Sequence, residues 1–334
     1  MALITPKNIL IIRPDAIGDL VLTLPAIHAV RKKFPEAKIT VLAQDYTHPL
    51  LAHHPDIDEI ICDYDLKKYN FDLSINFYNQ FQDTWATFKA GIPSRLGDSS
   101  RILTGWMNNL RVFRHWEDQD RHEIDLNFYL LAPLGIKEKP EKPKLIIEPG
   151  ALLKIKILLE KNGIKPGDRL AGIHIGASTS KSWTIEGFAK VAAWLAKERN
   201  YKILLLGGKA ETNRAEKMTK LINCPSINLV GQLPLADLVA MISQLNFYLG
   251  MDTGPSHIAA ALNVPMVMLF LNKQALPTRW GPFKVRHLTV AKQKGEENIS
   301  AERVIAACDT ILQGGGFTTP EESFPHWQSE SRGL

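Results

Sequence analysis

The feature that most constrains the fold is an alternation of short, largely apolar runs with longer segments of helical periodicity. Asn8–Arg13 is the first apolar run, residues 19–33 have helical spacing and a basic end, and Lys38–Ala43 is the next apolar run. Apolar runs without a two-residue period are typical of parallel strands that are buried on both faces. Strand, helix and strand within roughly 35 residues predict a β-α-β unit.

This alternation occurs in two series. The first continues with apolar runs at 59–62 and 73–77, and a helix is expected at 123–134. The second series follows the charged, proline-punctuated stretch 137–144, which is typical of a linker. Its expected strands are 169–175, 202–207, 227–229, 247–250 and 265–271, and its expected helices are 151–162, 184–199, 212–222, 235–244 and 256–262. We therefore expect an α/β protein with two Rossmann-like, doubly wound domains facing a central cleft, at 1–150 and 151–313, and an irregular tail at 314–334.

Composition narrows the class of protein. The chain has 334 residues, 45% of them hydrophobic, which suits two packed domains and excludes a disordered chain. Its three cysteines, Cys62, Cys224 and Cys308, are too far apart for a disulfide framework or a zinc site and fit a reducing, cytoplasmic compartment. No secretory signal or membrane span is expected. The net charge of +5 permits an anionic partner, but no nucleic-acid recognition motif is present.

Several familiar motifs are absent. The chain has neither the G-x-G-x-x-G nor the G-x-x-x-x-G-K-[ST] pattern, and no G-x-S-x-G elbow. Asp-x-Asp pairs occur in three unrelated places, but no loop assembles a ligand set for a metal. We expect neither a bound metal nor a cofactor.

Ligands of open α/β sheets bind beyond the carboxyl ends of the strands, so the loops there are the candidate sites. Asp19 follows the first strand, at the start of a helix. It could cap that helix or complement its dipole, or it could act as a general base toward a hydroxyl group. Asp15 lies close enough in the sequence to compete for the second role.

Two loops of the second series have the composition of an anion site, and a third contains an acidic residue that could bind a ribose. Gly176 and Ala177 leave backbone N–H groups open, and Lys181 adds a positive charge near them. Asp252 and His257 flank the start of an alanine-rich helix, whose N-terminal N–H groups form an anion site. The other candidates are Ser178 and Thr179 as hydroxyl donors, Thr253 or Gly254 as the helix N-cap, and Glu211 as an acceptor of ribose hydroxyls. Each could instead have a structural role, Lys181 as a solvated lysine, His257 as a buried histidine and Glu211 as the first residue of a helix.

Arginines gather in the irregular middle of the first domain. Arg95, Arg101 and Arg121, with Arg111 and Arg114, are interleaved with tryptophans. Forked guanidinium groups could hold an anionic ligand. The alternative is a solvated loop that nearby acidic residues partly neutralise.

Taken in order, several stretches resemble glycosyltransferase family 9, the ADP-heptose:lipopolysaccharide heptosyltransferases. The stretches are Ile11–Pro25, His122–Asp125, His174–Ser178 with Lys181 and Trp183, Gly207-Gly208 with Glu211, Asp252–Ala261 and Arg279–Pro282. They span residues 8–282 in the order expected for the family. Phe270-Leu-Asn-Lys273 departs from it, standing where Phe-Gly-Pro is common, and Thr184 replaces a proline but can cap a helix.

The resemblance implies a GT-B fold, in which the first domain binds the acceptor and the second the nucleotide sugar. It implies inverting, metal-independent transfer of heptose from ADP-heptose to an anionic lipopolysaccharide core precursor. Carried over by position, Asp19 is the base, Glu211 holds the ribose, and Asp252 lies near the donor. The diphosphate would be held by Lys181, Thr253, Gly254 and His257, with Ser178 and Thr179 beside them. Such an enzyme would be cytoplasmic, with peripheral contact at the inner membrane left open.

Two alternatives stay open at this stage. The chain could be a transferase of the same family that uses another nucleotide sugar or a protein acceptor. It could also be a nucleotide-binding protein without catalysis. An Asp19→Asn variant would separate the enzymes from the binding protein.

Overall fold

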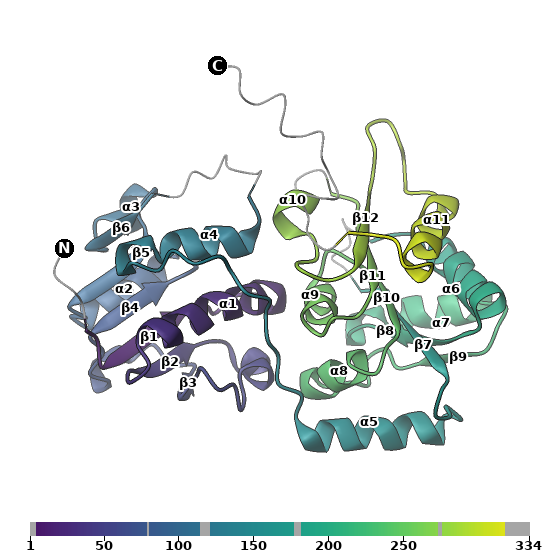
Figure 1. Cartoon of the computed structure of the whole chain (residues 1–334), viewed down its shortest axis with the longest axis horizontal. Helices are drawn as coiled ribbons and strands as arrows, with labels where there is room; N and C mark the ends of the chain where they lie inside the picture. Colours follow the sequence, from purple (N-terminus) through teal and green to yellow (C-terminus); the bar gives the residue numbers. More distant parts are fainter. Residues whose placement is uncertain (1–4, 79, 114–120, 177–181, 273–275, 318–334) are drawn as a thin grey trace. The chain divides into compact units, whose positions relative to one another are not determined.

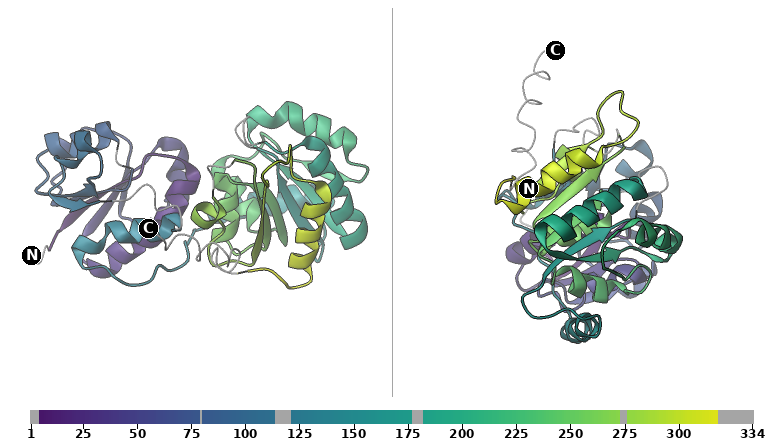
Figure 2. Two further views of the ribbon diagram at one scale, coloured as in Figure 1. Left: turned by 90° about the horizontal axis from the view of Figure 1, so that it is seen from above. Right: turned by 90° about the vertical axis from the view of Figure 1, so that its right-hand side faces the viewer.

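Two parallel β-sheets carry the fold (Figure 1). Their strand orders are β3-β2-β1-β4-β5-β6 and β12-β11-β10-β7-β8-β9. The structure is a computed structural model that describes residues 5–78, 80–113, 121–176, 182–272 and 276–317. The chain divides into two compact units, Met1–Ile146 and Ile147–Leu334, and each unit contains one of the sheets. In both units, helices cover the faces of the sheet (Figure 2).

The first unit alternates strands and helices along the chain. Its strands are β1 (Asn8–Ile12), β2 (Lys38–Leu42), β3 (Glu59–Ile61), β4 (Leu73–Asn76), β5 (Ser94–Asp98) and β6 (Leu110–Val112). Its α-helices are α1 (Ile17–Lys33), α2 (Phe81–Lys89), α3 (Ile102–Gly105) and α4 (Glu123–Leu130), with 3-10 turns η1 (Asp45–Leu50), η2 (Leu66–Lys68) and η3 (Ala132–Leu134). α1 packs against α4, and α2 packs against α3.

The second unit repeats the pattern. Its strands are β7 (Arg169–His174), β8 (Tyr201–Leu206), β9 (Ser226–Asn228), β10 (Phe247–Met251), β11 (Met266–Phe270) and β12 (His287–Ala291). Its helices are α5 (Pro149–Lys161), α6 (Ile185–Arg199), α7 (Thr212–Leu221), α8 (Leu235–Ile242), α9 (Gly254–Ala261), α10 (Pro277–Trp280) and α11 (Ala301–Leu312), with the 3-10 turn η5 (Lys209–Glu211).

The two sheets have the same topology. Counted from β7, the strands of the second sheet follow the order of the first, read from its other edge. All the neighbouring strands described are parallel. This is the doubly wound Rossmann order, and it confirms the α/β fold class expected from the sequence. The order reverses between β1 and β4 in one sheet and between β7 and β10 in the other, so a ligand site is expected at each reversal.

Three strands and two longer helices lie where the sequence predicted no element. They are β5, β6 and β12 with α2 and α11, together with the short helices α3 and α10. β5 contains Arg95 and Gly97, and β6 is only three residues long, so neither has a long apolar run. α2 buries polar side chains and exposes aromatic ones, which reverses the usual helical pattern.

The core of the second unit is organised around Trp183. Its side chain is fully buried, lies edge-to-face on Phe188 with ring centroids 4.9 Å apart, and donates a hydrogen bond from Nε1 to the Ile299 carbonyl (2.9 Å). The next residue, Thr184, caps α6 as its sequence position allows, accepting a hydrogen bond from the Gly187 N–H (3.1 Å). Together these contacts fix the point at which the chain enters α6.

The outer strands of both sheets are short. β3, β6 and β9 have three residues each, whereas β12 has five. β12 is joined by an antiparallel bridge between His287 and Phe317, with N···O distances of 2.8 and 2.9 Å. Among the described residues, no helix combines the length and the apolar character that a membrane span requires.

Candidate active site

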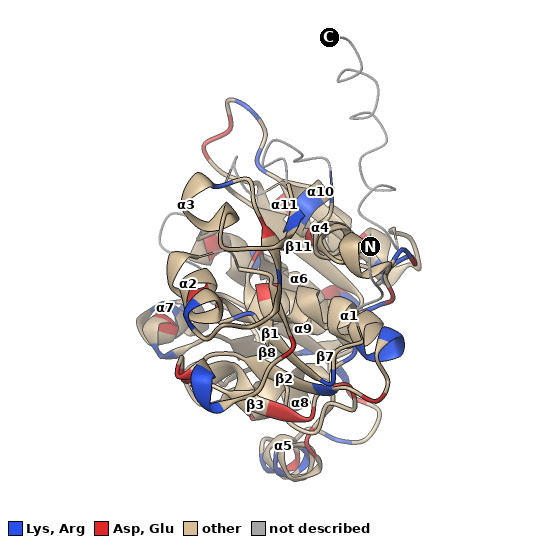
Figure 3. Ribbon diagram, turned by 90° about the vertical axis from the view of Figure 1, so that its left-hand side faces the viewer, with Lys and Arg blue, Asp and Glu red and all other residues tan. Residues whose placement is uncertain are grey.

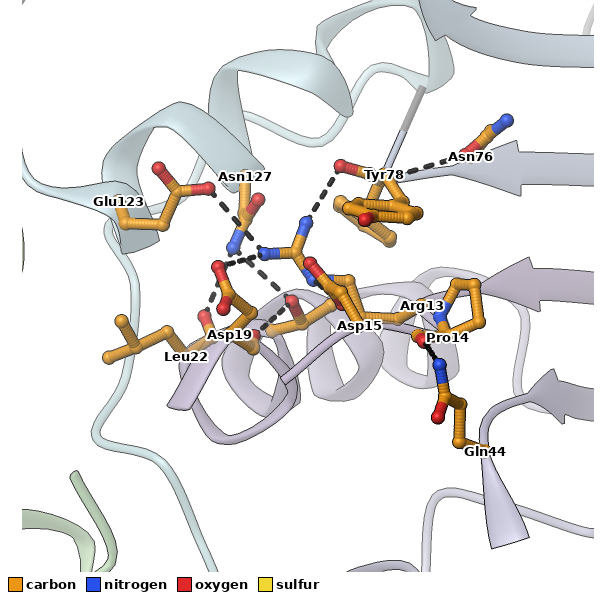
Figure 4. A network of polar contacts seen from close by, with 12 residues as sticks. Arg13, Pro14, Asp15, Asp19, Leu22, Gln44, Asn76, Tyr78, Glu123 and Asn127 are labelled. Carbon is orange, nitrogen blue, oxygen red and sulfur yellow. Dashed lines mark hydrogen bonds and ion pairs between the residues drawn. The ribbon is translucent and has the colours of Figure 1, made fainter. Parts of the chain in front are cut away.

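In the first unit, the strand-order reversal places the β1–α1 connection beside the end of β4. Arg13, Asp15 and Asp19 come from this connection and from the first turn of α1 (Figure 4). Asp19 does not cap α1, because the N-cap is Ala16 and no side chain accepts a hydrogen bond there. Its carboxylate accepts a hydrogen bond from Arg13 Nη2 (2.9 Å). The negative charge in the first helical turn still complements the helix dipole.

Arg13 joins four elements at this point. Its side chain is 3% exposed, and its Nη1 donates to the Phe77 carbonyl just after β4 (2.7 Å). Nε lies 3.0 Å from Asp15 Oδ1, and Nη2 lies 3.7 Å from Glu123 Oε1 at the start of α4. One buried guanidinium group therefore holds Asp15, Asp19 and Glu123 around it. This role of Arg13 was not predicted, although a charged residue at the end of an apolar strand is a signal for it.

The three carboxylates differ in their access to solvent. The side chains of Asp15 and Glu123 are 11% and 4% exposed, whereas that of Asp19 is 26% exposed. Burial raises the pKa of Asp15 to about 7, and the nearby charges of Asp19 and Glu123 add to this rise against the opposing effect of Arg13. Because the effect of burial on the pKa outweighs the opposing charge of Arg13, Asp15 holds a proton over part of the neutral range. Asp19 is the carboxylate best placed to reach a ligand.

Asp19 and Asp15 open into a hollow of about 910 Å³ within the first unit. This volume is in the usual range for a small-molecule site. The lining residues are Pro14, Asp15, Ala16, Asp19, Gln44, Tyr46, Tyr64, Tyr78, Gln80, Phe81, Gln82 and Asp83. Tyrosine, glutamine and aspartate side chains present ring faces and hydrogen-bonding groups together, which suits a polyhydroxylated ligand such as a sugar.

Hydrogen bonds to the backbone and to neighbouring side chains fix several lining residues. Gln44 Nε2 donates to the Pro14 carbonyl (2.6 Å), and the Tyr46 hydroxyl donates to the Asp15 carbonyl (3.2 Å). The Tyr64 hydroxyl donates to Asp83 Oδ1 (2.6 Å). None of these residues was predicted from the sequence to belong to a site. Gln44 and Tyr46 follow β2 and Tyr78 follows β4, so the rule of searching beyond strand ends would have found them.

The three arginines predicted to bind an anion lie outside the lining of this hollow. Arg95 is part of β5, and its guanidinium donates to the carbonyls of Met107 (2.7 Å) and Ile92, which fastens the β5–β6 connection. Arg101 is the exposed N-cap of α3, and Arg121 precedes α4 with its guanidinium 5.8 Å from the Tyr129 ring centre. Their predicted binding role stays a prediction.

In the second unit, the candidate residues gather at the β7–β10 reversal. α9 starts directly after β10, with Thr253 as N-cap and no side chain accepting a hydrogen bond at that cap. Its first N–H groups thus have no side-chain cap to satisfy them, and together with the helix dipole they favour an anion. Ser256 is turned away from this end, because its hydroxyl donates to the Met251 carbonyl.

His257 and Asp252 stand together at the same helix end. His257 Nε2 lies 3.7 Å from Asp252 Oδ1, and the two side chains are 4% and 14% exposed. The imidazole is held beside the N-terminus of α9, where its N–H could contact the ligand that the helix end attracts. Gly254 begins α9, so four of the predicted donor-site residues are brought together: Asp252, Thr253, Gly254 and His257.

Glu211 lies against the end of β7. A Cβ added to Gly176 would be 3.3 Å from the Glu211 carboxyl group and 2.8 Å from the His174 ring, so only glycine fits there without displacement. Glu211 Oε2 accepts a hydrogen bond from the Gly208 N–H (2.8 Å), which shows a structural role at the start of η5. Burial lowers the pKa of His174 to about 4, which keeps its ring neutral. The predicted residues Ser178, Thr179 and Lys181 lie outside the described residues.

The family profile and the related sequences point to the same family of proteins. The family profile of glycosyltransferase family 9 (heptosyltransferase) matches residues 63–305. Lipopolysaccharide heptosyltransferase 3 of Escherichia coli K12 is 26% identical over 341 residues, covering 88% of this chain and 95% of that protein.

Solved structures show the same fold. A glycosyl transferase family 9 protein from Veillonella parvula superposes with a TM-score of 0.84 at 22% identity, covering 94% of this chain and 99% of that one. ADP-heptose lps heptosyltransferase II of E. coli superposes with a TM-score of 0.76 at 21% identity, covering 92% and 99%. Within each unit, the sheet and its helices are therefore arranged as in the structures of GT-B heptosyltransferases.

Proposed function

Because the chain belongs to glycosyltransferase family 9, the heptosyltransferases, and is therefore a glycosyltransferase, we propose that it transfers heptose from ADP-heptose to a lipopolysaccharide inner-core acceptor. The observation that carries the mechanism is the Asp19 carboxylate, oriented by buried Arg13 at the edge of a hollow suited to a sugar. Asp19 and this hollow belong to the unit proposed to bind the acceptor, and α9 belongs to the unit proposed to bind the donor.

The proposed reaction is a single inverting displacement. An acceptor hydroxyl attacks the anomeric carbon of the heptose as the bond from that carbon to the diphosphate oxygen breaks, and ADP leaves. Asp19 takes the hydroxyl proton, which is general-base catalysis. Its hydrogen bond to Arg13 holds one carboxylate oxygen in place, and its side chain, which is 26% exposed, lines the hollow.

The leaving diphosphate requires stabilisation of its growing negative charge. The uncapped N-terminus of α9 and the adjacent His257 provide N–H donors for this purpose without a metal ion. Lys181, Ser178 and Thr179 are proposed to add to the diphosphate site, with Thr253 and Gly254 at the helix start. Glu211 is proposed to accept hydrogen bonds from the ribose, and Asp252 to orient the loop beside the donor.

The acceptor is proposed to be an anionic, lipid-linked core precursor. Arg101 and Arg121, with Arg95, are proposed to contact its acidic groups, and the hollow beside Asp19 to receive the sugar that carries the reacting hydroxyl. The enzyme would then work at the cytoplasmic face of the inner membrane as a peripheral protein. The E. coli relatives named for lipopolysaccharide support this acceptor class.

A thermal-shift panel tests the donor. ADP, UDP, GDP and ADP-heptose are compared, because a ligand that binds the folded state raises its apparent stability. We expect shifts with ADP and ADP-heptose that persist in EDTA. The Phe270–Lys273 stretch departs from the family pattern, which makes the comparison of bases informative. Stabilisation by UDP or GDP but not by ADP would refute ADP-heptose as donor, and loss of transfer in EDTA with recovery on Mg²⁺ addition would refute metal independence.

A further inference from the structure

A row of exposed aromatic side chains runs along α2 and onto the end of α3. We call Phe81, Trp85, Phe88 and Trp106 the aromatic ladder. Successive ring centroids are 6.1, 5.8 and 5.0 Å apart. The four side chains are 54%, 42%, 36% and 56% exposed. Four contacting aromatic residues in this state form a continuous apolar surface, which soluble proteins rarely leave without a partner.

The orientation of α2 is the reverse of that in an ordinary amphipathic helix. Asp83, Thr84 and Thr87 face the protein and are at most 1% exposed, while the aromatic residues face outward. Both Asp83 and Thr84 accept a hydrogen bond from the protein side, since the Tyr64 hydroxyl donates to Asp83 Oδ1 and Asn76 Nδ2 donates to the Thr84 hydroxyl (3.1 Å), and only Asp83 Oδ2 among their side-chain oxygens accepts none from the described residues. These buried polar contacts hold α2 with its aromatic face toward the solvent.

The neighbouring helix adds an aliphatic tip. Ile102 and Leu103 begin α3 and are 92% and 73% exposed. α3 packs beside α2 in the first unit (Figure 3). The ladder and this tip, which we call the α3 tip, therefore belong to one surface.

The exposed charged residues of the described segment 80–113, which carries this surface, are all basic. Between residues 80 and 113 the only acidic residues are Asp83 and Asp98, and both are buried. Lys89, Arg101 and Arg111 are the exposed charged residues of that segment, and all three are basic. Exposed aromatic and aliphatic groups with a basic rim are the pattern of peripheral proteins that bind anionic lipid surfaces.

The surface formed by the aromatic ladder and the α3 tip extends to the hollow that Asp19 lines. Phe81 is the first residue of the ladder and also lines the hollow that contains Asp19, as does its neighbour Tyr78, which is 37% exposed. A lipid-linked acceptor held by its lipid at the ladder would thus have its sugar close to Asp19. We propose that the aromatic ladder and the α3 tip dock the first unit on an anionic phospholipid bilayer. This inference rests on the proposed function for its lipid-linked acceptor.

Two other occupants fit less well. Symmetric pairing of two copies through this face would bring basic rims toward each other. A sugar would stack on open ring faces, but Phe81 and Trp85 are nearly parallel, at 8°, and stack on each other. The bilayer is therefore the partner that the observations favour.

Vesicle sedimentation tests the proposal with the full chain. Vesicles of phosphatidylethanolamine and phosphatidylglycerol are compared with vesicles of phosphatidylcholine. The test variant is Ile102→Ser with Leu103→Ser, and the matched control is Leu153→Ser on α5, where the side chain is 61% exposed. We expect the wild type to bind the anionic vesicles selectively and the double variant to bind at least about tenfold more weakly. Lys89→Glu should weaken binding several-fold, and Leu153→Ser should not.

Two further measurements separate this inference from the proposed function. The double variant should transfer sugar to a water-soluble, deacylated acceptor at the wild-type rate, and Asp19→Asn should bind vesicles like the wild type. Absence of anionic vesicle binding by the wild type would overturn the docking surface and the peripheral membrane location, and would leave the proposed transfer reaction standing. So would light scattering that shows a wild-type dimer which the double variant dissociates. Vesicle binding without any transfer activity would retain the surface and overturn the function.

Discussion

Replacing Asp19 by asparagine should abolish most of the transferase activity and leave the fold intact. The asparagine Oδ1 can still accept the hydrogen bond from Arg13 Nη2, which is 2.9 Å long in the native protein. Asp15 and Glu123 remain beside Arg13, so its charge stays compensated. Since the Asp19 side chain is already 26% exposed, the free energy of unfolding should change by no more than about 1 kcal/mol.

The effect on the rate is much larger because the amide cannot take the proton of the acceptor hydroxyl. A positioned general base contributes about 10²–10⁴-fold, which corresponds to roughly 3–5 kcal/mol in the activation free energy. The assay is ADP release at saturating donor and varied acceptor. We expect kcat to fall by that factor and the Kd for ADP, measured by calorimetry, to remain unchanged.

Asp15→Asn is the matched control, because Asp15 is the neighbouring carboxylate that also lines the hollow. Its side chain is less exposed than that of Asp19, so the loss of kcat at the optimal pH should be less than about tenfold. Equal losses in both variants would show that the cluster acts as a unit. An Asp19→Asn enzyme with wild-type kcat would refute the assignment of the base.

The remaining predictions concern the support of the two sites. Arg13→Met leaves three carboxylates around an apolar side chain and should lower the free energy of unfolding in urea by about 3–5 kcal/mol. A change below about 1 kcal/mol would show that Arg13 does not hold Asp15, Asp19 and Glu123 in place. Asp15 has a folded-state pKa of about 7, above its ordinary 3.8, so the folded state binds an extra proton between these values. The contribution of Asp15 to stability should therefore fall as the pH rises from 4 to 7, and thermal melts of Asp15→Asn should lack this contribution when compared with the wild type over the same pH range. His257→Ala should weaken ADP binding about 10- to 100-fold by calorimetry, the value of a hydrogen bond to a charged group, and an unchanged Kd would exclude His257 from the diphosphate site. Trp183→Ala should cost about 3–5 kcal/mol in urea unfolding, because it removes a buried ring and its hydrogen bond to Ile299; a loss near zero would mean that this core repacks.

The sequence predicted the elements whose signal is local. β1 and α1 are evident from a continuous apolar run followed by helical spacing, and α9 from an N-cap and a proline before alanines. α2 was missed because its aromatic residues face outward and its polar residues inward. A periodicity argument assumes that apolar groups are buried, and this helix breaks that assumption.

The sequence predicted which loops form the site, but it did not predict which residues of those loops contact one another. Asp19, Asp252 and His257 follow strands, and the strand rule identifies such positions. The Arg13 contact with Phe77 joins residues 64 positions apart, and it arises only when β1 and β4 pair. The same applies to the lining of the hollow, which comes from the segments that follow β1, β2, β3 and β4 and that approach one another in the folded sheet.

The short outer strands of the two sheets affect how readily copies of the protein aggregate. A sheet edge offers unpaired N–H and C=O groups to any other chain, and long, flat edges promote aggregation. β3, β6 and β9 offer only three residues each. The longer β12 is protected by the bridge from Phe317. The residues just after α11 thus shield an edge, and a chain shortened before Phe317 should remain folded at its sites yet become prone to self-association.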